Sequence, residues 1–273
     1  MIMSRVSDRL NRLSYSQTFV MSNKARDMKA AGIDVISLTL GEPDFDVPDN
    51  IKKAAFDAIN ENYSHYSPVP GFLELRKAIV NKLKRDNNLD YKPTQICVAN
   101  GAKQNIFNVL AALVNEGDEV ILPAPYWVSY DEMVKINGGV SVFIETNIDT
   151  EFKMTAEQLE AAITPKTKAV LYSSPCNPSG SYYTREELEK IANVMAKYPD
   201  VVIISDEIYE FINYDGEHVS IAEFPQVFNQ TAVINGMSKA FAMTGWRIGY
   251  SACPQWLADA CDKLQGQVTS GAN

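Results

Sequence analysis

The fold is decided by residues 168–206, which read KAVLYSSPCNPSGSYYTREELEKIANVMAKYPDVVIISD. This stretch holds two apolar, β-branched runs, Lys168–Ser173 and Val201–Asp206, and each run predicts a strand. Between them lies Thr184-Arg-Glu-Glu187, a capping box followed by an apolar stripe of helical spacing. The succession of strand, helix and strand is typical of parallel strands that belong to one sheet.

The same alternation continues outward from this stretch, beginning at about residue 49. Amphipathic spacing predicts helices over Asp49–Asn62 and Lys103–Asn115, and a second capping box begins at Thr155. The remaining predicted strands are Ile96–Asn100, Glu119–Leu122, Val140–Glu145, Ala232–Asn235 and Arg247–Ala252. We therefore expect an α/β fold, a three-layer α/β/α sandwich with a mostly parallel seven-stranded sheet.

Composition excludes several classes of protein. The 273 residues carry 25 basic and 34 acidic side chains, and the net charge of −9 disfavours nucleic acid or an anionic membrane as a partner. Four cysteines without Cys-x-x-Cys spacing and two histidines are too few for a disulfide framework or a structural zinc site, so we expect no metal. No apolar run suits a signal peptide or a membrane span, and we expect a soluble, cytoplasmic protein.

The residues that follow the strands are the first candidates for a site, because ligands of open parallel sheets bind at the carboxyl ends of the strands. Asn100-Gly101-Ala102-Lys103 leads from a strand directly into a helix, whose amino end attracts an anion. The alternative is an ordinary turn whose small residues allow close packing.

Asp206 ends a nearly all-apolar strand. Burial there raises the pKa of a carboxyl unless a cation or a hydrogen-bond donor partners it, so we expect a positive neighbour. The alternative is that Asp206 caps the amino end of a helix.

Ser238, Lys239 and Arg247 lie close together in the sequence after the strand at Ala232–Asn235. Two cations and a hydroxyl suit a phosphate group and a reactive lysine, whose pKa must fall through burial or a nearby cation such as Arg247. The alternative is a solvated surface lysine. Asn177 stands between two prolines that fix the direction of its side chain, and Trp127 offers a flat aromatic face, with core packing as its alternative.

At these residues the sequence resembles the fold-type I pyridoxal-phosphate aminotransferases, in the bacterial branch of the aspartate aminotransferase-like class I/II family. The resemblance extends over essentially the whole chain. Its motifs are Leu40-Gly41-Glu42-Pro43-Asp44-Phe45, Tyr66-Ser-Pro-Val-Pro-Gly71, Pro125-Tyr-Trp-Val-Ser-Tyr130, Ser205-Asp-Glu-Ile-Tyr209 and Ser238-Lys-Ala-Phe-Ala-Met-Thr-Gly-Trp-Arg-Ile-Gly249. Each motif is weak alone, but the ordered set is specific.

The resemblance implies a role for each residue around the cofactor ring. Lys239 would form the Schiff base with pyridoxal 5'-phosphate and then carry the proton between the substrate and the cofactor. Asp206 would pair with the pyridine nitrogen. Tyr209 and Asn177 would bind the 3′ oxygen of the ring, and Trp127 would stack on it.

The resemblance also implies a phosphate site and a dimer. The phosphate would lie at the helix start formed by Gly101, Ala102 and Lys103, with Ser238 and Arg247 completing the charge. Tyr66 would reach this phosphate from a neighbouring subunit, which implies a homodimer with shared active sites.

For substrates, the resemblance implies an amino acid and a 2-oxo acid. Lys103 would grip the distal carboxylate of aspartate or glutamate, and Gly41, Trp127 and Asn177 would also contact the substrate. Ser16 and Thr18, with Gly41, lie in the segment that resembles the part closing over it. We therefore expect an aminotransferase that moves an amino group from aspartate or glutamate to a 2-oxo acid, and transamination of prephenate is an alternative.

The sequence departs from the family pattern after Arg247, because no later arginine is present to clamp the substrate α-carboxylate. We expect residues 1–48 to form an N-terminal arm and small-domain segment and residues 49–273 the cofactor-binding large domain, with the C-terminal small domain absent. The missing clamp suggests one alternative, a cofactor-binding fragment without turnover. A separate alternative keeps the cofactor but changes the reaction to that of a β-lyase or decarboxylase. A nicotinamide dehydrogenase is disfavoured because no Gly-x-Gly-x-x-Gly follows a predicted strand.

Overall fold

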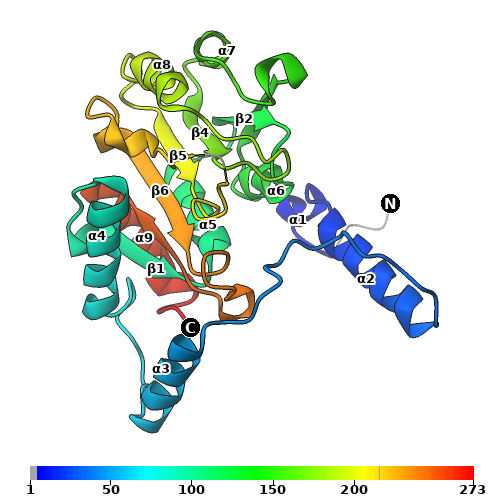
Figure 1. The fold of residues 1–273 in the computed structure, drawn as a ribbon. Helices are drawn as coiled ribbons and strands as arrows, with labels where there is room; N and C mark the ends of the chain where they lie inside the picture. The colour runs from blue at the N-terminus through cyan, green and yellow to red at the C-terminus, as the bar shows by residue number, and fades with distance from the viewer. Residues whose placement is uncertain (1–4, 215) are drawn as a thin grey trace.

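The structure, a computed structural model, describes residues 5–214 and 216–273. Its strands form one seven-stranded sheet with the order β1-β7-β6-β5-β4-β2-β3 (Figure 1). The strands are β1 Ile96–Ala99, β2 Glu119–Ala124, β3 Val140–Glu145, β4 Thr167–Ser173, β5 Val202–Asp206, β6 Thr231–Gly236 and β7 Gly249–Ala252. Every strand predicted from the sequence is present, and the bounds differ by at most two residues at each end.

Strand β7 is the exception in an otherwise parallel sheet. It runs antiparallel to both of its neighbours, β1 and β6, whereas the other pairings are parallel. The carboxyl ends of the other six strands therefore meet at one edge of the sheet, together with the start of β7. This edge is where the candidate site residues gather.

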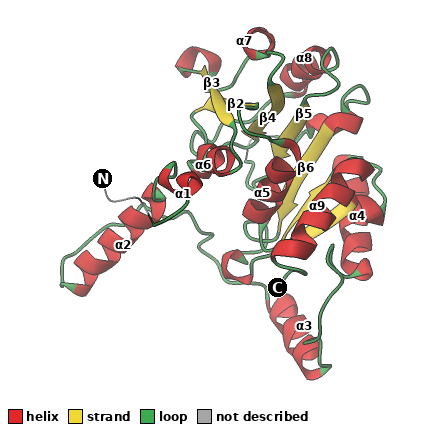
Figure 2. Ribbon diagram, turned by 180° about the vertical axis from the view of Figure 1, so that it is seen from behind, coloured by secondary structure: helices red, strands yellow, loops and turns green. Residues whose placement is uncertain are grey.

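Helices cover both faces of the sheet (Figures 1 and 2). They are α1 Asp8–Asn11, α2 Gln17–Ala30, α3 Asp49–Asn60, α4 Leu73–Asn87, α5 Ala102–Leu113, α6 Ser129–Ile136, α7 Ala156–Ala162, α8 Arg185–Met195 and α9 Gln255–Val268. Both predicted capping boxes are present, since the Thr155 and Thr184 hydroxyls accept from the backbone N–H groups of Gln158 and Glu187 at 3.2 and 3.3 Å.

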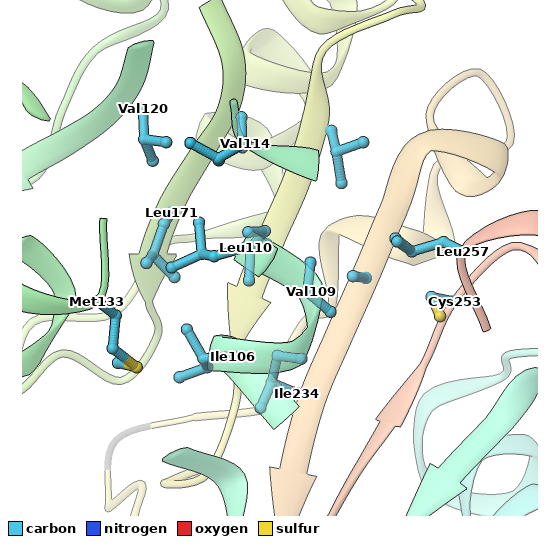
Figure 3. Close-up of a cluster of buried hydrophobic side chains, with 14 of the residues drawn as sticks. Ile106, Val109, Leu110, Val114, Val120, Met133, Leu171, Ile234, Cys253 and Leu257 are labelled. Atoms are coloured by element: carbon cyan, nitrogen blue, oxygen red, sulfur yellow. The ribbon is translucent and has the colours of Figure 1, made fainter. Parts of the chain in front are cut away.

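The alternation of side chains along each strand divides the core into two layers. On β6, Ile234 belongs to the cluster under α5, α6 and α9, whereas Val233 belongs to the cluster under α4 on the opposite face. Figure 3 shows the first cluster, where Ile106 and Leu110 of α5 approach Leu171 of β4. The opposite face also holds the cluster under α7 and α8. The predicted three-layer α/β/α sandwich is confirmed.

The amino-terminal part of the chain lies beside this sandwich. Helices α2 and α3 project from the sheet in both views (Figures 1 and 2), and the aromatic side chains Phe19 and Phe56 are exposed. The division of the chain at residue 49 stays a prediction. Across the described residues, none of the helices has the length and apolar character that crossing a membrane requires.

Candidate active site

The turn between β1 and α5 forms one wall of the site. Gly101 is the N-cap of α5 and has φ of 88°, a left-handed conformation that glycine adopts without strain. A Cβ atom at this position would lie 2.3 Å from Nη2 of Arg247. The first N–H groups of a helix have no acceptor within it, so the Ala102 and Lys103 amides are available to a ligand here.

Arg247 lies beside this turn because β7 runs in the reverse direction. It lies two residues before the start of that strand. Its guanidinium donates from Nη1 to the Thr244 carbonyl at 2.9 Å and from Nη2 to the Asn100 carbonyl at 3.3 Å. The helix start and the guanidinium thus form one positive wall, which suits a doubly charged anion such as a phosphate group.

Asp206 lies at the end of β5 and is 4% exposed. Its Oδ2 accepts from the Tyr130 hydroxyl at 2.6 Å, and its Oδ1 accepts from the Ile208 N–H at 3.3 Å. Burial raises the pKa of this carboxyl to about 6, although both hydrogen bonds oppose the shift and the charge of Glu207 adds to it.

The surroundings of Asp206 differ from both expectations drawn from the sequence. Among the described residues, no cation forms an ion pair with it, and a turn rather than a helix follows it. The physical reason is that β5 delivers the carboxylate into the core, where a neutral hydroxyl from α6 supplies the donor. A ligand with a positive group would therefore supply the missing countercharge.

Lys239 faces the same edge from the loop after β6. Its Nζ donates to the Gly41 carbonyl at 2.7 Å and lies 5.7 Å from the centroid of the Tyr209 ring. Burial and the charge of Arg247 lower the pKa of this ammonium, while the charge of Glu42 opposes them. This lysine is therefore not a solvated surface lysine.

The remaining predicted ring contacts lie on neighbouring loops. Asn177 donates from Nδ2 to the Tyr209 hydroxyl at 3.3 Å, and burial raises the pKa of that hydroxyl. Lys103 places its Nζ 4.8 Å from the Trp127 ring centroid, and loss of water and the charge of Arg247 lower its pKa. Trp127 also contacts Tyr130 edge to face, with ring centroids 5.5 Å apart.

The structure brings most of the predicted residues to one edge but leaves some outside. Ser238 is buried immediately before Lys239. Tyr66 is fully exposed, at 100%. Ser16 and Thr18 lie at the start of α2, which projects from the sheet (Figure 1).

Tyr130 is the residue in contact with the site that sequence reasoning missed. It stands in the motif that ends Trp-Val-Ser-Tyr130 and lies in α6, and only the tertiary fold brings its hydroxyl to the end of β5. A polar group at the end of a buried tyrosine needs a partner, and that requirement was the one available signal.

Comparisons with known proteins agree with this geometry. Residues 33–273 match the family described as aminotransferase class I and II. A probable aspartate/prephenate aminotransferase of Rhizobium leguminosarum is 52% identical over 272 residues, which cover 99% of this chain and 68% of that protein. An aspartate aminotransferase of a Bacillus species is 51% identical, covering 97% of this chain and 68% of that protein.

A solved structure gives the same result for the fold. The aspartate aminotransferase of Thermus thermophilus, determined with maleate, superposes with a TM-score of 0.96 at 41% identity, covering 99% of this chain and 70% of that one. Because the family match and the relatives extend over nearly all of the described sheet and its loops, the chain belongs to the aminotransferase class I and II family.

Proposed function

We propose that this chain uses pyridoxal 5'-phosphate to move the amino group of aspartate or glutamate to a 2-oxo acid. The observation that carries the proposal is the placement of Lys239 and Asp206 at one edge of the sheet, with a positive wall at Gly101 and Arg247 beside them. A reactive amine, a buried acid and an anion site are the three parts that this cofactor requires.

The residues present fit the cofactor. The Ala102 and Lys103 amides, Ser238 and Arg247 would hold its phosphate, and the space beside Gly101 is too narrow for a side chain. Asp206 is a buried carboxylate, and a protonated ring nitrogen would partner it. Trp127 would stack on the ring. When bound, the cofactor supplies an aldehyde that condenses with amines and a ring that accepts electrons.

Lys239 is the group that moves protons. Because burial and Arg247 lower its pKa, more of its amine is neutral near neutral pH than in a solvated lysine. A neutral Nζ can accept a proton from the Cα atom of the substrate and return it at another atom, which is general acid–base catalysis. Its hydrogen bond to the Gly41 carbonyl at 2.7 Å holds the amine at this edge.

Other side chains of the site orient the reacting groups. Asp206 would keep a ring nitrogen protonated, and the hydrogen bond from the Tyr130 hydroxyl fixes the direction of that carboxylate. Tyr209 and Asn177 are linked to each other and would bind a ring oxygen, while Asn177 and Gly41 would contact the substrate carboxylate. Lys103, over Trp127, offers a point charge for a second carboxylate.

The second carboxylate is the basis for aspartate and glutamate as donors. The Thermus thermophilus relative was solved with maleate, a dicarboxylate, which supports this class of substrate. The Rhizobium leguminosarum relative is named an aspartate/prephenate aminotransferase, and prephenate is the second candidate acceptor for the present chain.

We also propose a cytoplasmic homodimer. Tyr66 is fully exposed in its own chain, so it is free to complete the phosphate site of a second copy. The four cysteines are unpaired, which suits a reducing compartment. Sedimentation of the purified protein tests the dimer, and loss of phosphate affinity in Tyr66→Phe tests the shared site.

The proposed function is tested by visible absorption of the protein with pyridoxal 5'-phosphate. We expect an absorption band in the unsubstituted protein that is absent from Lys239→Ala. Adding aspartate or glutamate to the unsubstituted protein should bleach this band and release a 2-oxo acid. Lys197→Ala is the matched control, because Lys197 is an exposed lysine that pairs with Glu160 away from the site.

The outcomes distinguish transamination from the alternative reactions. A band that survives in Lys239→Ala would refute the assignment of the lysine. A lysine-dependent band without release of a 2-oxo acid would refute transamination, while pyruvate from a β-substituted donor, or carbon dioxide, would favour a lyase or decarboxylase. Comparison of 2-oxoglutarate with prephenate as acceptor then decides between the two candidate acceptors.

A further inference from the structure

The turn after β5 presents chemically active side chains on two opposite sides. Asp206 and Tyr209 lie toward the candidate active site, where they contact Tyr130 and Asn177. The intervening Glu207 and the following Glu210 are also buried, 1% and 6% exposed, although neither contacts those residues. Two buried carboxylates so close together require partners.

Glu207 is fully partnered on the side away from the site. Its Oε1 accepts from the Ser205 hydroxyl at 3.0 Å and from the Ser220 hydroxyl at 2.7 Å. Its Oε2 lies 3.1 Å from Nε2 of His218, whose side chain is 9% exposed. This carboxylate therefore ties the turn to the segment that precedes the short helix Ile221–Glu223.

Glu210 is fully partnered by other elements. Its Oε1 forms an ion pair with Lys82 of α4, and its Oε2 accepts from Nδ2 of Asn235, in β6, at 2.8 Å. The Lys82 ammonium also donates to Oδ1 of Asn87 at 2.8 Å. This second carboxylate ties the same turn to α4 and to the strand that leads to Lys239.

Each of the two carboxylates lies beside a basic side chain, His218 for Glu207 and Lys82 for Glu210. Burial and the charge of Lys82 lower the pKa of His218. The hydrogen bond and charge of Glu207 and the charge of Glu210 raise it by more, so the pKa is raised overall. Burial also raises the pKa of Glu210, and the charge and hydrogen bond of Lys82 oppose that shift. Each carboxylate oxygen already has a donor, so the acidic pair with His218 forms a closed network rather than a metal site.

We propose that Glu207, Glu210, Lys82 and His218 are positioning residues that hold Asp206 and Tyr209 in the geometry required to bind the cofactor ring. This inference rests on the proposed function, because it assigns a ring to those two side chains.

The backbone of the turn explains why such anchors are needed. Residues 207–210 form a turn rather than a helix, with bonds from the Glu210 N–H to the Glu207 carbonyl at 3.0 Å and from the Ile212 N–H to the Tyr209 carbonyl at 2.8 Å. A short turn with few backbone hydrogen bonds changes conformation at a low cost in free energy. Because Glu207 and Glu210 alternate with Asp206 and Tyr209, fixing the first pair fixes the direction of the second.

The test compares Lys82→Met with Gln230→Met in the full chain. Lys82 is partly buried, whereas Gln230 is buried and donates to three backbone carbonyls. Gln230 ends the short helix just before β6, away from the turn. Each variant is measured for thermal unfolding, for amide exchange of the peptide 205–212 without added cofactor, and for the dissociation constant of pyridoxal 5'-phosphate. His218→Gln, which keeps a hydrogen-bond donor for Glu207 but removes the titratable ring, is the milder second variant if Lys82→Met does not fold.

We expect both methionine variants to melt at lower temperature. Only the network variants should accelerate exchange within 205–212 and weaken cofactor binding by about tenfold, because displacement of the turn misplaces Asp206 and Tyr209. Gln230→Met should change binding by less than about twofold. Equal exchange in the network and control variants, or faster exchange with unchanged binding, would overturn the proposal.

Failure of the proposed function has a different signature. The unsubstituted protein would then show no lysine-dependent absorption band, while amide exchange would still report on the turn. If the network variants exchange faster but the unsubstituted protein binds no cofactor, the assignment of the turn to a cofactor ring is overturned.

Discussion

Replacing Asp206 by Asn should stabilise the protein against unfolding at neutral pH when no cofactor is added. Burial raises the pKa of this carboxyl from 3.8 to about 6, so the folded chain resists its ionisation. Each tenfold change in proton affinity corresponds to about 1.4 kcal/mol, and the whole difference therefore corresponds to about 3 kcal/mol. Asparagine fills the same volume without a charge and avoids that cost.

The sign of the pH dependence follows from proton linkage. Between about pH 4 and pH 6 the folded state binds more protons at Asp206 than the unfolded state does, so the free energy of unfolding falls as pH rises through this window. Below the window the cost is absent, and above it the cost is complete. The advantage of Asp206→Asn should therefore grow across the window and then stay level.

The assay is urea unfolding of both proteins at about pH 4 and about pH 8, with the difference between them taken at each pH. Asp86→Asn provides a control of opposite sign, because the Arg85 hydrogen bond and charge lower the pKa of Asp86 despite its partial burial. Asp86→Asn should lower the free energy of unfolding by more at high pH than at low pH. A stability difference between Asp206→Asn and the unsubstituted protein that does not change with pH would refute the buried, unpaired carboxylate.

Two further substitutions probe the same edge of the sheet. Gly101→Ala should weaken cofactor binding by about tenfold or more, because its Cβ atom would meet the Arg247 guanidinium at 2.3 Å. Gly117→Ala is the control, since Gly117 also has positive φ but has open space around it, and it should leave binding unchanged. Spectral titration with the cofactor compares the two variants. Tyr130→Phe removes the hydroxyl that donates to Asp206 at 2.6 Å, and it should raise the pKa of Asp206 further, since a hydrogen bond to a charge is worth about 1.5–3 kcal/mol. The unfolding experiment should then show a pH dependence that extends over a wider window. An unchanged window would contradict this role of Tyr130.

Much of the fold and site could be predicted because both depend on short-range patterns. Apolar runs mark the strands, capping boxes mark the starts of α7 and α8, and the carboxyl ends of parallel strands meet at one edge. That single rule predicted that Gly101, Asn177, Asp206 and Lys239 lie at one edge of the sheet, and the structure places them there. Their chemical roles stay predictions, carried by the family resemblance.

The features that could not be predicted depend on contacts between distant residues. Tyr130 reaches Asp206 across 76 positions, and no local pattern in the sequence indicates that contact. Lys82 and Glu210 come from α4 and from the turn after β5. The reversal of β7 alone brings Arg247 to the helix start at Gly101, and no local pattern distinguishes a reversed strand from a parallel one in a mostly parallel sheet.

The electrostatics of the site point to a ligand with charges of both signs. Burial, and after it the charge of Arg247, lowers the pKa values of Lys239 and Lys103, so the wall that these three cations share favours an anion. At the end of β5, burial raises the pKa of Asp206, and no cation among the described residues pairs with this carboxylate. A phosphate at the first place and a protonated ring nitrogen at the second would relieve both costs at once, and a ligand with only one of these groups would relieve one. Inorganic phosphate should therefore bind without lowering the pKa of Asp206, whereas the complete cofactor should lower it, because only the cofactor brings a positive charge to that carboxylate.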